Sequence, residues 1–210
     1  MPIQRAAHSL PGPAGALEVI EERRTGEISA TAVICHPHSV YGGSLDNKVV
    51  YRLARSFLEL GAVSIRFNFR GVGDSQGGFD HGEGELEDLA AVVHWARGRW
   101  PERPLWLAGF SFGGAVVLKG ARRLSPDWLV TVAPAIRYLA SDATPAPGVR
   151  WLVIQGTEDD VVPTVRLRAW LQGLQVSPRL VLIEGAGHFF HGHLNDLRQA
   201  VLGAAQSRGA

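Results

Sequence analysis

The residues of this chain best suited to chemistry begin with a G-x-S-x-G pattern at positions 109–113, which places Ser111 between two glycines. An apolar run, residues 105–108, precedes the pattern, and helix-forming residues, 115–119, follow it. This order is typical of a serine nucleophile held on a strained turn between a strand and a helix. In so tight a turn, a Cβ at either glycine would collide with neighbouring backbone. The pattern predicts that Ser111 is a nucleophile.

A second G-x-S-x-G pattern, at residues 73–77, places Ser75 between glycines in the same way. Further glycines stand at positions 71 and 78, and no helix-forming run follows directly. A serine in such a glycine-rich segment belongs to a loop rather than to a strand-to-helix turn. The context therefore favours Ser111 as the nucleophile and Ser75 as a loop residue.

A serine hydroxyl becomes nucleophilic when a base takes its proton, and the base needs an acid to orient it. Two other apolar runs, residues 151–155 and 180–184, end in loops that carry such groups. The second loop contains His188, the candidate base. The candidate acids in the first loop are Glu158, Asp159 and Asp160. Because the carboxyl ends of parallel strands meet at one edge of a sheet, we expect the serine, acid and histidine to converge there.

The elements that must position these groups alternate along the chain. Apolar strands are predicted at residues 30–35, 62–69, 105–108, 128–133, 151–155 and 180–184. Helical spacing of apolar residues predicts helices at 49–60, 83–97, 112–124, 164–174 and 193–206. Residues 2–9 and 16–20 flank a Pro-Gly turn and indicate a β-hairpin. The fold class predicted is α/β: a three-layer α/β/α sandwich whose twisted, mostly parallel sheet carries an N-terminal antiparallel hairpin.

The organisation indicates a single domain over residues 1–210, without internal repeats. Only a short, proline-rich segment, residues 134–150, separates the strands at 128–133 and 151–155. This segment is too short to hold a helical cap domain. We therefore expect an open site.

Composition narrows the classes of partner. The chain has 46% hydrophobic and 20% charged residues and a net charge of +1, with acids and bases interleaved, so no nucleic-acid or membrane partner is expected. No apolar run approaches the roughly 20 residues that span a bilayer, and residues 1–5 lack the apolar core of a signal peptide. A single cysteine, Cys35, fits a reducing compartment. The sequence predicts a cytoplasmic protein, and it does not indicate an oligomeric state.

Several motifs between residues 30 and 193 together carry a family resemblance. They are residues 35–49, residues 67–75, the G-x-S-x-G turn, the acid-bearing loop and the Gly-His-Phe-Phe sequence at 187–190. In these motifs the chain resembles the α/β-hydrolase superfamily, and within it the small esterase-like proteins that lack a lid. The resemblance implies an α/β-hydrolase fold without a cap domain, Ser111 as nucleophile, His188 as base and Asp159 as acid. Asp159 is the fourth residue of a Gly-x-x-Asp turn, and its neighbour Asp160 is the alternative.

An oxyanion hole needs two backbone N–H groups aimed at the oxygen that becomes negative. The residue after the nucleophile, Phe112, supplies one at a helix start, where the helix dipole also helps. The resemblance places the second in the loop after the strand at 30–35 and favours His38, with Ser39 or Val40 as alternatives. In the resembling subgroup the position of Ser39 is commonly proline, which is a departure near this loop.

The resemblance implies a serine hydrolase that cleaves carboxylic esters, with short acyl chains favoured because the site is open. The same triad serves thioesterases, lactonases, acyltransferases and peptidases, and a non-catalytic binding protein on this fold is a further alternative. The expected partner is a small-molecule ester, with neither a metal nor an organic cofactor. Tyr41 and Phe189 are the candidate residues of the substrate pocket. A metal site formed by His188, His191, His193 and Asp196 is disfavoured because no supporting pattern accompanies it.

Overall fold

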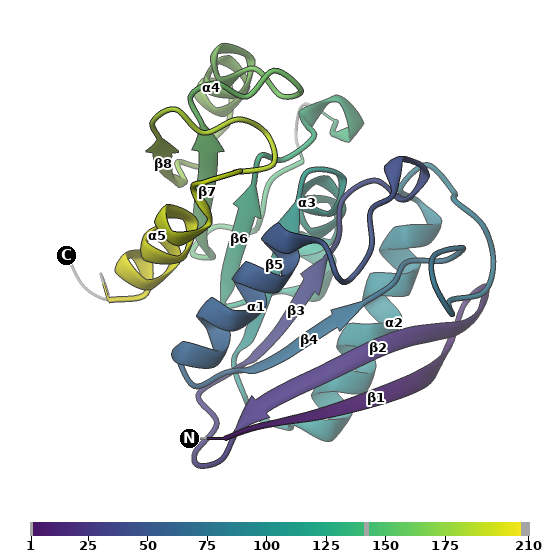
Figure 1. The fold of residues 1–210 in the computed structure, drawn as a ribbon. Helices are drawn as coiled ribbons and strands as arrows, with labels where there is room; N and C mark the ends of the chain where they lie inside the picture. The colour runs from purple at the N-terminus through teal and green to yellow at the C-terminus, as the bar shows by residue number, and fades with distance from the viewer. Residues whose placement is uncertain (1, 141–142, 207–210) are drawn as a thin grey trace.

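The computed structural model describes residues 2–140 and 143–206. Its strands are β1 (Ile3–Gly12), β2 (Gly15–Arg24), β3 (Thr31–Cys35), β4 (Val63–Phe67), β5 (Leu105–Phe110), β6 (Trp128–Val132), β7 (Arg150–Gly156) and β8 (Arg179–Ile183). Its helices are α1 (Lys48–Glu59), α2 (Gly84–Arg99), α3 (Phe112–Leu124), α4 (Thr164–Gln172) and α5 (Leu194–Gln206), with 3-10 turns η1 (Ser39–Tyr41) and η2 (Ile136–Tyr138) (Figure 1). The ends of the predicted domain, residues 1 and 207–210, and residues 141–142 lie outside the described residues.

All eight of these strands form one sheet in the order β1-β2-β4-β3-β5-β6-β7-β8. The pairs β1–β2 and β2–β4 are antiparallel, and every other neighbouring pair is parallel. The N-terminal hairpin is longer than predicted, because pairing runs from Ile3 opposite Arg24 to Gly12 opposite Gly15. The predicted fold class, a mostly parallel sheet with an N-terminal antiparallel hairpin, is confirmed.

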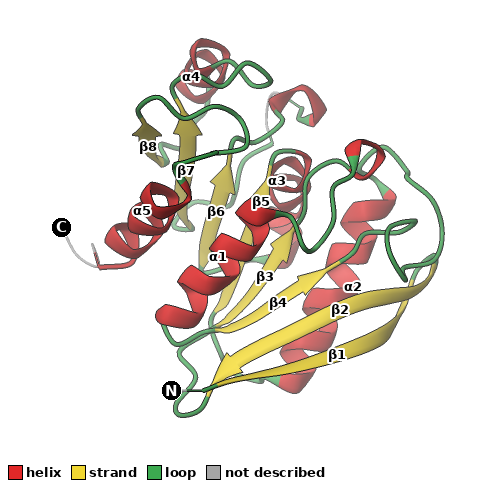
Figure 2. Ribbon diagram, viewed as in Figure 1, coloured by secondary structure: helices red, strands yellow, loops and turns green. Residues whose placement is uncertain are grey.

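Helices cover both faces of the sheet, as Figure 2 shows. One layer contains α1 and α5, which pack against each other, and the opposite layer contains α2 and α3. The strands β3, β4, β5 and β6 are buried along their whole length. Strands sandwiched in this way need apolar side chains on both faces, which explains their continuous rather than alternating hydrophobic runs.

The sheet order creates a crevice at the carboxyl end of β3. From β3 the chain crosses through α1 to β4 on one side, and β5 lies on the other side of β3. At such a reversal the loops after the two central strands separate and leave room for a ligand. The loop after β3 and the β5–α3 turn therefore face each other across this point.

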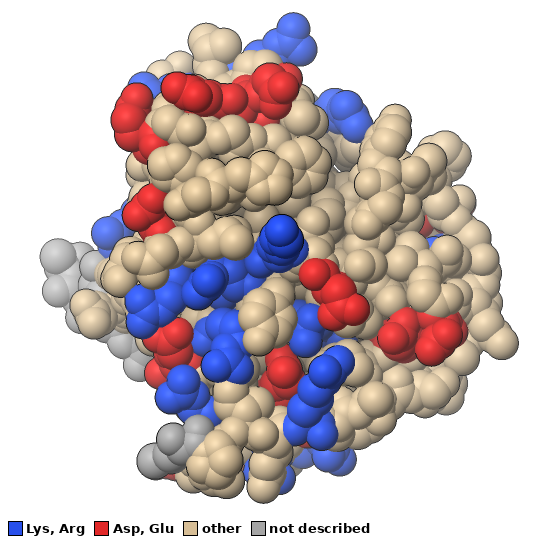
Figure 3. Space-filling view, viewed as in Figure 1, with Lys and Arg blue, Asp and Glu red and all other residues tan. Residues whose placement is uncertain are grey.

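The segment between β6 and β7 contains the 3-10 turn η2 and, within its described residues, no α-helix. The described residues of this segment therefore place no helical cap over the sheet. On the face shown in Figure 3, Lys and Arg gather over α1 and α5 with acidic residues among them. An ion pair between Arg198 of α5 and Glu59 of α1 joins these two helices. None of the described helices has the length and apolar character needed to cross a membrane.

Candidate active site

Ser111 lies on the tight turn between β5 and α3, with a φ of 54°. This left-handed backbone conformation is strained for a residue with a side chain and is retained where the surroundings impose it. The surroundings here are two close backbone contacts. A Cβ at Gly109 would strike the carbonyl of Gly113, and one at Gly113 would strike the carbonyls of Cys35 and His36. Glycine at both positions thus permits the turn that lifts the serine side chain from the sheet.

Three side chains from the ends of three strands form a hydrogen-bonded chain. His188 Nε2 lies 3.0 Å from Ser111 Oγ, and His188 Nδ1 lies 2.8 Å from Asp159 Oδ2. All three residues are buried, with 8% of Ser111 exposed. A carboxylate can only accept a hydrogen bond, so His188 Nδ1 carries the proton that it donates to Asp159. His188 Nε2 is then free to accept a hydrogen bond from the serine hydroxyl. This is the geometry that a serine nucleophile and its base require.

Asp159 is held in place by more than the histidine. Its Oδ1 accepts hydrogen bonds from the backbone N–H groups of Val161 at 2.9 Å and Val162 at 2.7 Å. Its Oδ2 also accepts from Gln155 Nε2 at 2.9 Å. Four donors therefore converge on one buried carboxylate and hold it in a single orientation. Asp160, the alternative acid, is exposed and forms no hydrogen bond with His188.

The loop after β8 brings His188 over the nucleophile. Gly156 lets the carbonyl of Ala186 approach the end of β7, where a Cβ would collide with it. Phe190 closes the loop with a φ of 53° and is fully buried. The His188 ring packs against Phe110 at 5.1 Å between ring centres. These contacts fix the imidazole plane without using its nitrogens.

The two predicted oxyanion donors are backbone N–H groups that are unpaired among the described residues. Within the described part of the chain, the backbone N–H groups of Phe112 and His38 have no acceptor. The loop that contains His38 is tightly folded, because the His38 carbonyl accepts hydrogen bonds from the Tyr41 N–H at 3.1 Å and the Gly43 N–H at 3.0 Å. Two free donors beside the nucleophile are what an oxyanion hole needs. Their role in catalysis stays a prediction.

His36 fastens the start of this loop to the segment that follows β4. Its Nδ1 donates to the Pro37 carbonyl at 2.6 Å, and its Nε2 accepts the Phe69 backbone N–H at 3.0 Å. The side chain is fully buried, and burial lowers the pKa of His36 to about 4. A neutral imidazole with one donor and one acceptor satisfies both partners.

His38 reaches across the crevice to the 3-10 turn η2. Its Nδ1 accepts the Val40 backbone N–H at 3.3 Å, so Nε2 carries the proton and donates to Tyr138 Oη at 2.9 Å. The ring also packs between Phe79 and Phe112, at 4.6 Å and 5.0 Å between centres. Burial lowers the pKa of His38 below its usual 6.5, and the charge of Arg137 lowers it further.

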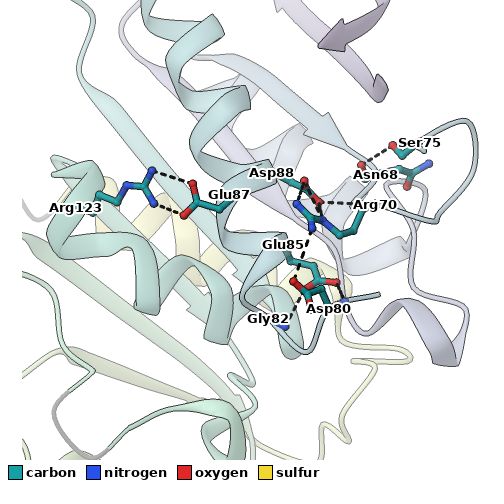
Figure 4. Close-up of polar contacts among 9 residues, drawn as sticks. All are labelled: Asn68, Arg70, Ser75, Asp80, Gly82, Glu85, Glu87, Asp88 and Arg123. Atoms are coloured by element: carbon teal, nitrogen blue, oxygen red, sulfur yellow. Dashed lines mark hydrogen bonds and ion pairs between the residues drawn. The ribbon is translucent and has the colours of Figure 1, made fainter. Parts of the chain in front are cut away.

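A buried ion-pair network holds the glycine-rich loop that presents Phe79. Arg70 pairs with the fully buried Asp88 at 2.8 Å (Figure 4). The carboxylate of Glu85 accepts from the backbone N–H groups of Asp80 at 2.9 Å and Gly82 at 2.7 Å. Since these bonds fix both ends of the segment around Phe79, they also fix the ring that packs on His38.

Ser75 lies in the same loop, and its hydroxyl has a structural role there. Its hydroxyl donates to the Asn68 carbonyl at 2.7 Å and accepts from the Glu18 backbone N–H at 2.9 Å. Figure 4 shows this hydroxyl directed at Asn68. The second G-x-S-x-G pattern is thus a loop, and its serine joins that loop to the N-terminal hairpin.

Two cavities meet at the nucleophile. The larger has a volume of about 420 Å³, and its lining includes Pro37, His38, Tyr41, Gly43, Ser111, Arg137, Val161, His188 and Phe189. The smaller has about 130 Å³ and is lined by Ser111, Ala135, Ile136, Arg137, Val161, Val162, Pro163 and Arg166. Tyr41 and Phe189, the predicted pocket residues, both lie on the wall of the larger cavity and are exposed to it.

Comparison with known proteins identifies the family of the chain. The model of a hydrolase family described as serine aminopeptidase, S33, matches residues 26–151. A crystal structure from Xanthomonas campestris, described as an α/β serine hydrolase without a lid, has 44% sequence identity and a TM-score of 0.91, and the match covers 98% of this chain and 95% of that one. The chain belongs to the α/β-hydrolase superfamily.

Two further relatives extend the match over nearly the whole of this α/β hydrolase. The structure of an α/β serine hydrolase homologue from Coxiella burnetii has 42% identity and a TM-score of 0.88, with 94% of this chain and 95% of that chain covered. An uncharacterized protein of Rickettsia prowazekii is 30% identical over 90% of this chain and 84% of its own length. This coverage shows that the chain is a member of the hydrolase family along nearly its whole length.

Sequence reasoning missed several side chains that support the site of this hydrolase. Gln155 is the penultimate residue of β7, and its Nε2 donates both to Asp159 and to the Val162 carbonyl, the latter at 2.8 Å. Asn68 accepts from the Leu45 backbone N–H at 2.8 Å, and Arg66 donates to the carbonyl of the same residue at 2.7 Å. A polar residue inside an otherwise apolar strand is the signal that could have found both Gln155 and Arg66.

The remaining candidates have structural explanations. Cys35 is fully buried, and burial raises the pKa of its thiol, with the charge of Asp88 raising it further. His193 pairs with Asp196 at 3.0 Å beside the start of α5. Among residues 2–140 and 143–206, no three His, Cys, Asp or Glu side chains gather closely enough to hold a metal ion.

Proposed function

We propose that this hydrolase cleaves carboxylic esters by way of an acyl-enzyme on Ser111. The observation that carries the proposal is the hydrogen-bonded chain from Asp159 through His188 to Ser111, which ends at a strained turn open to two cavities. A nucleophile, an oriented base and two free backbone donors together meet the needs of acyl transfer.

In the acylation step, Ser111 Oγ bonds to the ester carbonyl carbon while His188 Nε2 takes the hydroxyl proton. The carbonyl oxygen becomes negative and accepts hydrogen bonds from the N–H groups of Phe112 and His38. The oxyanion then collapses, the bond to the alkoxy oxygen breaks, and His188 returns the proton to that oxygen. Asp159 stabilises the imidazolium throughout and stays ionised.

In the deacylation step, a water molecule replaces the alcohol. His188 takes a proton from the water as its oxygen attacks the acyl carbon, and the same backbone donors hold the second oxyanion. Collapse breaks the bond to Ser111 Oγ, which recovers its proton from His188. The carboxylic acid leaves, and no metal or organic cofactor takes part in this proposal.

Peptide cleavage from an N-terminus is the second candidate, because the matching family is described as a serine aminopeptidase. An aminopeptidase must bind the α-ammonium group of its substrate, which a carboxylate does best. The described residues that line the two cavities include two arginines and no Asp or Glu. This charge favours ester cleavage over aminopeptidase activity.

A fluorophosphonate probe together with two substrate classes tests the proposal. We expect the probe to label the protein at Ser111, and the Ser111→Ala variant to lose both labelling and hydrolysis of p-nitrophenyl acetate. Labelling with rapid turnover of aminoacyl p-nitroanilides, and none of esters, would establish the peptidase instead. Absence of labelling and of turnover on both classes would reject a hydrolytic role.

A further inference from the structure

The position of the catalytic base divides the substrate between the two cavities. His188 and His38 line the larger cavity and are absent from the wall of the smaller one, while Ser111 borders both. Under the proposed function, His188 must deliver its proton to the leaving oxygen. The leaving alcohol therefore lies in the larger cavity, beside the imidazole, and the acyl chain extends into the smaller one.

The smaller cavity combines apolar walls with positive charge. Its walls include Ala135, Ile136, Val162 and Pro163, which suit a short hydrocarbon chain. Two arginines also line it: Arg137 from η2 and Arg166 from the first turn of α4. Arg137 follows β6 and Arg166 follows β7, so the two arginines come from segments that are separate in the sequence.

Neither guanidinium has a carboxylate partner among the described residues. Arg137 lies over the Tyr138 ring, 5.0 Å from its centre, and otherwise donates one long hydrogen bond of 3.5 Å to that hydroxyl. The side chain of Arg166 forms no hydrogen bond or ion pair with any of the described residues. The exposed acids Glu158 and Asp160 lie on either side of Asp159 in the loop after β7. They line neither cavity and form no ion pair with Arg137 or Arg166.

Two arginines elsewhere in the molecule, by contrast, are paired with carboxylates. Arg70 pairs with Asp88, and Arg198 pairs with Glu59. Unpaired guanidinium groups on a cavity wall keep their N–H donors available in a planar fork that matches a carboxylate. The two unpaired arginines line a small apolar cavity next to the nucleophile. Such a cavity suits a ligand that is short, apolar in its middle and anionic at its end.

We propose that this site selects esters whose acyl group is short and ends in a free carboxylate, that is, monoesters of short dicarboxylic acids. The scissile carbonyl lies at Ser111, the methylene groups lie between Ile136 and Val162, and the distal carboxylate binds Arg137 and Arg166. The inference rests on the proposed esterase function and adds the chemical class of its acyl group.

The test compares pairs of esters that differ in this carboxylate. Monoethyl glutarate is compared with ethyl pentanoate, and monoethyl succinate with ethyl butanoate, with the released acid titrated at constant pH. We expect kcat/KM to be about tenfold or more higher for the charged member of each pair, because hydrogen bonds to a charged group are the stronger kind. The difference should lie mainly in KM and should shrink as salt is added.

Variants assign the preference to its residues. Arg137→Gln and Arg166→Gln should each reduce the charged-to-neutral ratio of kcat/KM about threefold or more, and the ratio should be close to one in the double variant. Arg168→Gln is the matched control, since Arg168 lies on the same helix and lines a separate cavity. It should keep the wild-type ratio.

The outcomes separate this inference from the proposed function. Hydrolysis of the neutral esters with a ratio near one would overturn the carboxylate preference and leave the esterase intact. A ratio that falls equally in Arg168→Gln would also overturn it, because general surface charge would then be the cause. If no ester of either kind is hydrolysed and Ser111 resists the fluorophosphonate probe, the proposed function itself fails.

Discussion

At the scale of single residues, the site depends on which atoms carry protons. Asp159 Oδ1 accepts two backbone N–H groups, and Oδ2 accepts from Gln155 and His188. An oxygen with donors on every side cannot be exchanged for an NH₂ group without a conflict. The acid thus has a structural reason to be an aspartate.

The Asp159→Asn variant should therefore lose activity and keep its fold. Its amide oxygen can still accept from Val161 and Val162, while its NH₂ group faces the Nδ1–H of His188. The imidazole then adopts the other tautomer and presents a proton, instead of a lone pair, to Ser111. We expect kcat for p-nitrophenyl acetate to fall by about 10⁴. Asp160→Asn, one residue away and exposed, is the control and should change kcat little; the reverse ranking would reassign the acid.

Ser75→Ala should separate the two G-x-S-x-G patterns. The variant loses the hydrogen bonds of its hydroxyl to the Asn68 carbonyl and the Glu18 N–H, both in a buried place. Its free energy of unfolding should drop by about 1–3 kcal/mol, measured by urea denaturation. Labelling by the fluorophosphonate probe should persist, in contrast to Ser111→Ala. A silent probe in Ser75→Ala, with labelling retained in Ser111→Ala, would move the nucleophile to the loop.

His36 should make the stability of the fold depend on pH. Its pKa is about 4 in the folded protein, where burial disfavours the cation, against about 6.5 in the unfolded chain. Below pH 6.5 the unfolded state binds more protons, so the stabilising contribution, complete above pH 6.5, is lost as pH falls towards 4. The loss amounts to about 3 kcal/mol. Urea denaturation at pH 7 and pH 5 should show the decline, and His36→Gln should flatten it over this interval.

At the scale of elements, the strand-to-helix turn is specified by its glycines. Gly113 contacts the carbonyls of Cys35 and His36, so a methyl group there would push the loop after β3 away from the turn. Gly98, near the end of α2, has nothing within 4 Å of the place where a Cβ would stand. The two positions make a matched pair for one substitution.

Gly113→Ala should destabilise the protein and abolish ester hydrolysis, because it separates the two predicted oxyanion donors. Gly98→Ala should raise the free energy of unfolding by about 0.5–1 kcal/mol, since alanine has less backbone freedom to lose in a helix. Thermal unfolding with an activity assay measures both effects. Equal behaviour of the two variants would contradict the role given to the turn.

Elements were also the scale at which the sequence was most predictive. Helix α3 begins and ends where the apolar spacing placed it, and α1 is shifted by one residue at each end. Strand β5 continues two residues beyond its predicted end at Ala108, because Gly109 and Phe110 still pair with β6. Pairing depends on a neighbouring strand, which a local pattern does not contain.

The side chains that bridge elements were beyond prediction for the same reason. The chain order of serine, acid and histidine followed from the strand ends, and the structure brings those three together. The hydrogen bond from His38 to Tyr138 joins residues that are 100 positions apart, and no sequence pattern around either residue predicts it. Contacts of this kind depend on how two loops fold over the sheet, so only the three-dimensional structure provides them.

At the scale of the whole molecule, the sheet order decides how open the site is. Because β3 and β6 flank β5, the loop after β3 and the segment with η2 follow the strands on either side of the one that carries Ser111, and both segments contribute to the cavity walls. The described residues between β6 and β7 add no helix above them. A substrate can therefore reach the nucleophile without displacing an α-helix.

Substrate chain length should report this openness. Each buried methylene adds about 0.8 kcal/mol, so kcat/KM should rise with acyl length only while the chain finds apolar wall. The smaller cavity offers about 130 Å³, which an acyl chain of a few carbons fills. On p-nitrophenyl esters of increasing length, kcat/KM should thus peak at short chains. It should also show no jump when the ester exceeds its solubility limit, because no lid has to open at an interface. A continued rise towards long chains, or a sharp activation above the solubility limit, would mean that the acyl group lies in the larger cavity or that a segment closes over the site.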